Sequence, residues 1–124
     1  MTNFRFAALF IALVVMVASI TGSLRAAPDN TLGMAILAAS VNSDGTLLAG
    51  SGAASAAKLG TGQYRVDFDR DVLSCFRAAT LESSAGEIRA ITDTVTFNRV
   101  LVVTANSGGS ISDASFNLLV YCAR

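Results

Sequence analysis

The sequence predicts an all-β protein, an antiparallel β-sandwich of seven to eight strands. From Met34 onward, apolar and polar residues alternate in short segments that are rich in β-branched side chains, and no segment sustains a helical period. Clusters of Gly, Asn, Asp and Ser separate these segments about every 8–12 residues, a spacing typical of sandwiches. Alternation with a period of two is the pattern of a strand that is buried on one face.

Turn residues delimit the first strands. Residues 34–41 predict a strand, and residues 42–45, Asn-Ser-Asp-Gly, predict a hairpin turn, because Asp-Gly readily adopts positive φ angles. Residues 46–48 lead out of this turn. Residues 50–57 are almost all Gly, Ala and Ser, so we expect a strand there that packs closely against a neighbour. Residues 59–62 turn the chain again.

Residues 63–69 show the clearest alternation in the chain. The apolar side holds Tyr64, Val66 and Phe68, and the charged side holds Arg65, Asp67 and Asp69. Successive side chains of a strand point to opposite faces, so the apolar side is expected in the core and the charged side in water. We expect Arg65 and Arg70 to pair with the carboxylates.

The second half of the chain continues in the same manner. A loop is predicted at residues 106–110, Asn-Ser-Gly-Gly-Ser, and a turn at residues 82–86. The expected strands are 75–81, 87–92 and 95–99 on either side of Asp93, 100–104, and 115–122.

The amino terminus has the organisation of an export signal. It carries one basic side chain, Arg5, followed by an unbroken apolar run over residues 6–18 and then by small and polar residues. The run matches the roughly 7–15 residues of a signal peptide and is shorter than the ~20 residues of a membrane-spanning helix.

We therefore divide the chain into a signal peptide over residues 1–26, a short lead-in over 27–33 and a sandwich domain over 34–124. Ser23 and Ala26 are both open as the last residue removed. An uncleaved amino-terminal anchor is the alternative.

The exported part is close to neutral. Without residues 1–26 the chain has seven basic and nine acidic side chains, a net charge of −2. This balance provides no basic surface for a nucleic acid or an anionic membrane. We expect a secreted or periplasmic protein that has no nucleic-acid partner and does not bind membrane after signal cleavage.

Cys75 and Cys122 are the only two cysteines. In an oxidising compartment they are expected to form one disulfide, with two free buried thiols as the alternative. We expect this bridge to tie the last strand to the middle of the fold and to clamp the two sheets together. Two thiols without histidine provide too few ligands for a zinc site.

The residue inventory argues against catalysis. The sequence contains no histidine, which removes histidine-based acid–base chemistry, the Ser-His-Asp arrangement and most transition-metal sites. We therefore expect no catalytic residue, no cofactor and no metal ligand.

Acidic clusters leave two alternatives open. Asp67, Asp69 and Asp71 could bind calcium, but side chains at i and i+2 of a strand project in parallel and do not converge. The same question arises at Asn42 and Asp44, which we interpret first as turn residues. A carboxylate pair of the glycosidase kind is a further alternative, although no tryptophan is available to line a cleft.

Several side chains next to the cysteines have two interpretations. Phe76 and Tyr121 could form a stacking platform for a sugar, or one ring could cover the disulfide while the other packs at the rim. Arg77 and Arg99 lie within apolar strands, where they either extend over the sandwich surface or form a salt bridge in an oligomer.

Two segments resemble known families. The stretch VNSDGTLLAGSG followed by KLGTGQYRVDFDRDVLSC resembles a layout of small exported bacterial proteins of unknown function, and also the β-sandwich tip modules of phage tail fibres, which are similar to H-type lectin domains. The matching positions are Gly62, Tyr64, Val66 and Phe68, the loop Thr104 to Gly109, and Asp113, Phe116, Leu118 and Val120. The resemblance implies a compact sandwich with a surface-recognition role, with a trimer among the assemblies it allows.

Three functions remain open from the sequence. We favour an exported, non-catalytic structural or recognition module that binds a surface, a glycan or a protein through its loops. The alternatives are a subunit of an extracellular assembly, such as a homo-oligomer formed by edge-strand pairing, and a carboxylate-dependent extracytoplasmic enzyme.

Overall fold

The computed structural model describes residues 34–123 and confirms the all-β prediction. The expected signal peptide, its cleavage at Ser23 or Ala26, and the lead-in over 27–33 lie outside the described residues. Residues 34–123 form eight strands and no helix. The strands are β1 (Ala35–Val41), β2 (Leu47–Ser51), β3 (Ala53–Gly60), β4 (Gln63–Phe68), β5 (Phe76–Leu81), β6 (Gly86–Thr92), β7 (Arg99–Asn106) and β8 (Phe116–Cys122).

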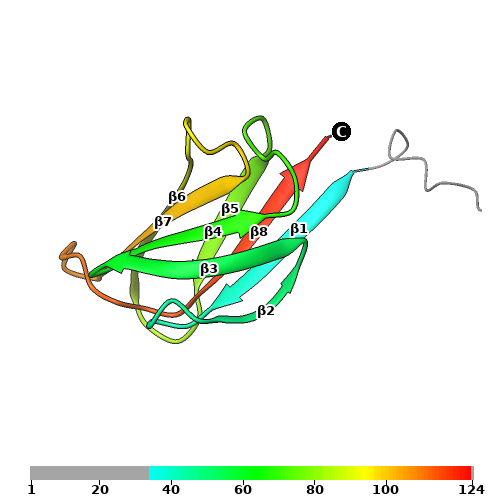
Figure 1. Ribbon diagram of the computed structural model, residues 1–124. Helices are drawn as coiled ribbons and strands as arrows, with labels where there is room; N and C mark the ends of the chain where they lie inside the picture. Colours follow the sequence, from blue (N-terminus) through cyan, green and yellow to red (C-terminus); the bar gives the residue numbers. More distant parts are fainter. Residues whose placement is uncertain (1–33, 124) are drawn as a thin grey trace, which may run out of the picture.

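Two four-stranded sheets build the sandwich (Figure 1). Sheet A has the strand order β2-β1-β8-β5, and sheet B has the order β3-β4-β7-β6. All neighbouring strands are antiparallel. The first and last strands, β1 and β8, are the two inner strands of sheet A, so the two ends of the described chain are paired at the centre of one sheet.

Alternation along the strands decides which side chains enter the core. The buried faces of β4 and β8 supply half of the core residues, and the rings of Tyr64 and Phe116 meet edge to face with centroids 5.2 Å apart. Burying a Val, Leu or Phe side chain contributes about 1.5–3 kcal/mol relative to exposure. The fully buried residues include Val41, Tyr64, Val66, Phe68, Val100, Val102, Phe116, Leu118 and Val120.

The small-residue segment is not one strand, as predicted for 50–57, but the junction between two. β2 ends at Ser51 and β3 begins at Ala53, so the chain passes from sheet A to sheet B at Gly52. Gly52 has a φ of 71°, and a Cβ atom there would collide with the side chain of Leu37. Glycine tolerates both conditions, which is why the bend falls at this residue.

The prediction of a strand over residues 95–99 is also wrong. The segment between β6 and β7 is a loop in which the carboxylate of Asp93 accepts hydrogen bonds from the backbone amides of Val95 (2.8 Å) and Thr96 (3.3 Å). The amide of Arg99 then donates to the carbonyl of Thr96 and closes the loop at 3.0 Å. Val, Thr and Phe by themselves favour a strand. An aspartate whose carboxylate accepts hydrogen bonds from the backbone amides that follow it favours a turn instead of pairing with another strand.

The disulfide between Cys75 and Cys122 is confirmed, with a Cα–Cα distance of 4.5 Å. Cys75 immediately precedes β5 and Cys122 ends β8, and these strands are neighbours in sheet A. The bridge therefore fastens two adjacent strands of one sheet, and the expectation that it clamps sheet A against sheet B is wrong. It does tie the last strand to the middle of the chain as predicted.

Candidate functional site: the loop end of the sandwich

The aspartates of the 67–71 segment have separate roles. Asp67 lies on the outer face of sheet B, directly opposite Arg99 of β7. Arg99 donates to its carboxylate from Nε (2.6 Å) and Nη2 (3.3 Å), and Ser55 Oγ lies 3.3 Å from the second carboxylate oxygen. Arg99, which the sequence analysis did not name as a partner of Asp67, is brought alongside it by strand register.

Electrostatics at Asp67 follow from this geometry. The hydrogen bonds from Arg99 lower the pKa of Asp67 below its ordinary value of 3.8, against an opposing effect of burial. The charge of Arg65 contributes a further, smaller attraction. Asp67 is therefore a charged structural partner near neutral pH.

Acidic side chains do not gather into a cation site within residues 34–123. No group of three or more His, Cys, Asp or Glu side chains in this range is placed to hold a metal ion. Asp44 accepts a hydrogen bond from the amide of Thr46 at 2.9 Å, which lowers the pKa of the carboxyl group. Gly45, with a φ of 91°, completes the tight turn predicted at 42–45. The geometry at Asn42 and Asp44 thus matches the turn interpretation.

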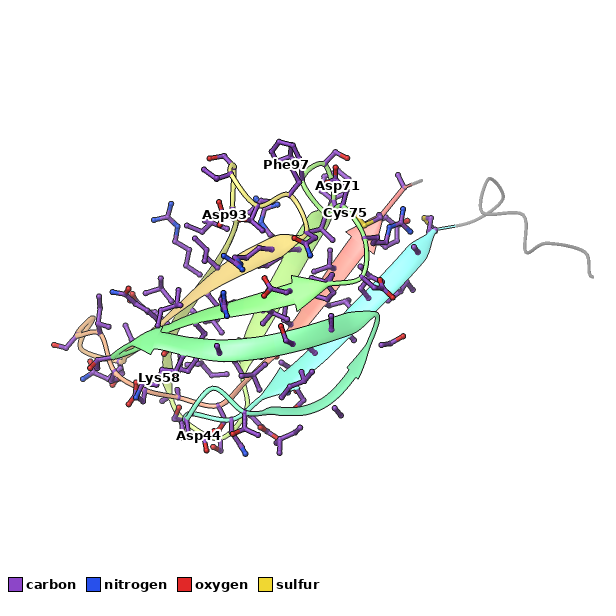
Figure 2. All side chains as sticks on the ribbon, in the orientation of Figure 1. Asp44, Lys58, Asp71, Cys75, Asp93 and Phe97 are labelled. Carbon is purple, nitrogen blue, oxygen red and sulfur yellow. A yellow bond between two sulfur atoms is a disulfide. The ribbon has the colours of Figure 1, made fainter. Side chains whose placement is uncertain are left out.

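Two loops meet at one end of the sandwich, and we call this region the loop end. It consists of residues 69–75, between β4 and β5, and residues 93–98, between β6 and β7. Figure 2 shows Asp71, Cys75, Asp93 and Phe97 together at this end, away from Asp44 and Lys58. The amide of Val72 donates to the carbonyl of Phe97 at 2.8 Å, so the backbones of the two loops are joined directly.

Each loop is held in shape by an aspartate. The carboxylate of Asp71 accepts a hydrogen bond from the amide of Leu73 at 2.8 Å, as Asp93 does from Val95 and Thr96. These backbone hydrogen bonds lower the pKa of Asp93. Both carboxylates stabilise turns because they replace backbone acceptors that the loops lack.

The loops are also fixed to the body of the protein. Val72 is almost fully buried in the core, and Cys75 ends its loop at the disulfide. In the other loop, the side-chain amide of Asn98 donates to the carbonyl of Phe68 at 2.9 Å. The loop end is therefore tied to the core, to the disulfide and to the end of β4.

Apolar side chains stand out from this rigid frame. Val95 is 87% exposed, Phe97 50% and Leu73 41%. Single exposed apolar residues are ordinary, but three of them on two joined loops form a group. Sequence reasoning missed this group because Val95 and Phe97 were assigned to a strand. The available signal was an aspartate followed two residues later by an apolar residue, which occurs at Asp71–Leu73 and at Asp93–Val95.

Opposite the loop end, a polar cluster closes the sandwich. The buried hydroxyl of Tyr64 donates to the carbonyl of Ser43 at 2.8 Å and accepts from the amide of Ala114 at 3.3 Å. Asp113 accepts from the amide of Gly62 at 2.7 Å and pairs with Lys58 at 2.5 Å. All of these contacts join Lys58 of β3 and Tyr64 of β4 to turns and loops of the same chain, so we assign the cluster a structural role.

The aromatic residues beside the cysteines lie on the outer face of sheet A. Phe76 and Tyr121 are opposite each other on β5 and β8, with ring centroids 6.4 Å apart, and Phe76 is 72% exposed. Cys75 and Cys122 are buried on the core side. The expectation that one ring covers the disulfide is wrong, because neighbouring residues of a strand face opposite ways.

Arg77, in β5, and Arg99, the first residue of β7, both make contacts within the chain. Arg77 donates from Nε to the carbonyl of Ala90 at 3.3 Å and from Nη1 to the carbonyl of Cys75 at 3.1 Å. Arg99 pairs with Asp67. Both guanidinium groups are therefore used to join neighbouring parts of the sandwich.

Comparisons with protein-family models, with curated proteins and with solved structures find no match for this chain. The resemblance to phage tail-fibre tips and H-type lectins therefore stays a sequence-based prediction. Over residues 34–123, no helix is long and apolar enough to cross a membrane.

Proposed function

We propose that the chain is an exported recognition module that binds a protein partner in the cell envelope or outside the cell through its loop end. The observation that carries this proposal is the set of exposed side chains of Leu73, Val95 and Phe97 on two loops that are joined to each other and tied to the core. Ordered loops lose little conformational entropy on binding, so apolar contacts made through them are retained as affinity.

The chemistry of this group favours a protein over a glycan. Aliphatic and aromatic side chains form the buried centre of protein interfaces, whereas sugars require a larger share of hydrogen-bonding groups around an aromatic platform. At the loop end the carboxylates of Asp71 and Asp93 already accept backbone amides of their own loops. The exposed side chains of Leu73, Val95 and Phe97 therefore offer apolar contact area.

Binding rather than catalysis is supported by the state of the carboxylates. Asp67 is engaged by Arg99, Asp93 by backbone amides, and Asp113 by Lys58 and the amide of Gly62. Hydrogen bonds and charges of this kind keep a carboxyl group ionised, and a general acid needs the opposite shift.

The disulfide is compatible with a periplasmic or extracellular location. Export by an amino-terminal signal peptide is part of the proposal. Amino-terminal sequencing of the exported chain tests it directly and distinguishes cleavage after Ser23 or Ala26 from an uncleaved anchor.

The binding test uses envelopes of the organism that encodes the chain. The purified, fluorescently labelled protein is titrated onto washed envelopes, and the same titration is done with the double variant Val95→Ser/Phe97→Ser. We expect the double variant to lose at least about tenfold in affinity, because a few central apolar residues dominate most interfaces. Val95→Ser alone, which changes a side chain that is 87% exposed, gives an intermediate loss without risk to the fold.

Leu59→Ser is the matched control. Leu59 is 56% exposed, close to the 50% of Phe97, but it lies near the end of β3, on the side of the molecule away from the loop end. It should bind as the unchanged protein does. Protease treatment of the envelopes should abolish binding, and periodate oxidation should not. Equal binding by the loop variants contradicts the proposed site, and binding that survives protease but is lost after periodate contradicts a protein partner.

A further inference from the structure

Charge is distributed very unevenly between the two sheets. Strands β1, β2 and β8 contain no charged residue, and β5 contains only Arg77, whose guanidinium group is turned to the carbonyl of Ala90. Every strand of sheet B carries at least one charge. These are Lys58, Arg65, Asp67, Glu87, Arg89 and Arg99. The outer face of sheet A is thus uncharged, in a protein whose other sheet has a normal solvated surface.

The outward side chains of sheet A form three rows across β1, β8 and β5. From the loop end downward, the rows are Ile36–Tyr121–Phe76, Ala38–Leu119–Ala78 and Ser40–Asn117–Thr80. The side chains of the first row are large and apolar, whereas those of the last row are smaller, polar and uncharged. The face is therefore raised at the end of Ile36, Tyr121 and Phe76 and low at the end of Ser40, Asn117 and Thr80.

The low end is hollowed into a groove of about 600 Å³. Its lining combines small residues of β1, β2 and β5, including Ala38, Ala49 and Ala78, with Asn117, Leu118 and Leu119 of β8, and it does not include Phe76 or Tyr121. Two features thus lie side by side on one face: a pair of aromatic rings, of which Phe76 is 72% exposed, and a groove lined mainly by small side chains together with Leu118 and Leu119.

We propose that this face is covered by a second copy of the same chain, in a two-fold symmetric dimer packed sheet A to sheet A. In such a dimer the raised row of each copy lies over the groove of the other, and the middle rows, with Leu119 and Ala78, meet near the axis. Two-fold interfaces require a surface that is complementary to itself, with residue i on j and j on i. Two copies of an uncharged face can pack together without like-charge repulsion. Two copies of the outer face of sheet B, which is charged, could not pack in this way as easily.

The edges of the sheets are less available for association than the face. The chain itself links β2 to β3 through Gly52, whose carbonyl accepts the amide of Asp69 at 2.9 Å. On the other side, Arg77 of β5 reaches the carbonyl of Ala90 of β6. The sequence analysis considered association by edge-strand pairing. Packing of the two sheet A faces against each other, with the sheets about 10 Å apart as in a sandwich, explains the uncharged surface better.

The size of the face sets the expected affinity. Four strands about 4.8 Å apart, each with about six residues of 3.3 Å, make a face of about 300–400 Å². This is roughly half of the ~800 Å² that each partner buries in a standard interface. We therefore expect a weak dimer with a dissociation constant on the order of 10–100 µM.

The test is sedimentation equilibrium of the exported, disulfide-bonded chain from about 1 µM to about 1 mM, a range that brackets this affinity. The mean mass should rise from that of one chain to that of two. Ala78→Arg, which places a charge in the middle row of both copies, should raise the dissociation constant at least about tenfold. Ala49→Arg, in the groove but on another strand, is the second variant in case one of them does not fold.

Ala54→Arg is the matched control, because Ala54 is likewise an exposed alanine of an edge strand, but in sheet B. It should dimerise as the unchanged chain does. Monomers throughout the concentration range overturn the inference, and so do an equal effect of Ala54→Arg or growth beyond the dimer. This experiment uses purified protein without envelopes, so its failure leaves the proposed function of the loop end untouched.

Discussion

At the scale of single residues, the pair Asp67–Arg99 links two inner strands of sheet B at their outer face. Both carboxylate oxygens of Asp67 accept hydrogen bonds from the Arg99 guanidinium group. The Nη1 atom of the same group lies 3.9 Å from Oδ2 of Asp93. Of these side chains, only Asp67 belongs to the set Asp67, Asp69 and Asp71 that the sequence suggested as a cation site. Its carboxylate instead has an intramolecular use, as the partner of the Arg99 guanidinium group.

The pair makes stability depend on pH in a defined direction. The pKa of Asp67 is lowered in the folded state, so its contribution is complete above the pKa of the unfolded chain and is lost as pH falls through the folded value. We expect Asp67→Asn to lower the free energy of unfolding at pH 7 and to have a much smaller effect near pH 2–3. Urea denaturation at both pH values measures the difference.

A double-mutant cycle with Arg99→Gln separates this pair from other acid effects. The coupling free energy between the two positions should be favourable at pH 7 and close to zero at low pH. A coupling that is equal at both pH values contradicts the assignment of the pH dependence to Asp67.

At the scale of elements, the disulfide has a local and a global effect. It joins the start of β5 to the end of β8 and closes a chain segment with a sequence separation of 47. The chain-entropy model gives roughly 4 kcal/mol as the upper limit for a segment of this length. Because β5 is an edge strand of sheet A, the bridge also holds the strand that begins directly after the loop end.

Reduction should therefore lower the free energy of unfolding by about 2–4 kcal/mol. Urea denaturation with and without a thiol reductant measures it, and the variant Cys75→Ser/Cys122→Ser, which should not respond to reductant, is the control. Equal stability of the oxidised and reduced protein would contradict this role of the bridge.

The elements also show what the sequence could and could not predict. Strands with strict alternation, such as β4 and β8, were predicted with nearly the observed bounds, because one face must be buried. The bend at Gly52 was missed because a run of Gly, Ala and Ser has no alternation to interrupt. Residues 95–99 were misassigned because β-branched residues favour strands unless a capping side chain, here Asp93, competes.

The candidate sites were less predictable than the strands. The pairing of Asp67 with Arg99 depends on the register of β4 against β7, and residues 32 apart in sequence carry no local sign of it. The uncharged face of sheet A requires strand order to be known, since its rows combine β1, β8 and β5. Only the lack of charge in β1 and β8, and the single charged residue Arg77 in β5, are visible in the sequence.

At the scale of the whole molecule, the two surfaces that we assign to binding are adjacent but distinct. The loop end carries Leu73, Val95 and Phe97, and the outer face of sheet A begins beside it at Phe76. A dimer through sheet A would place two loop ends on one particle. Two linked sites bind a surface more tightly than one when both can engage at once.

This arrangement depends on loops that keep their shape in the unbound protein. The backbone amides of Val72, Leu73 and Val95 all donate hydrogen bonds within the loop end. If the loops are as ordered as these bonds indicate, their amides exchange with solvent slowly.

Hydrogen exchange of these three amides, resolved by NMR, is the most direct measurement. We expect them to exchange at least about tenfold more slowly than the same residues in unstructured peptides of the loop sequences. Exchange at the peptide rate would show that the loop end is not ordered before binding and would contradict the account.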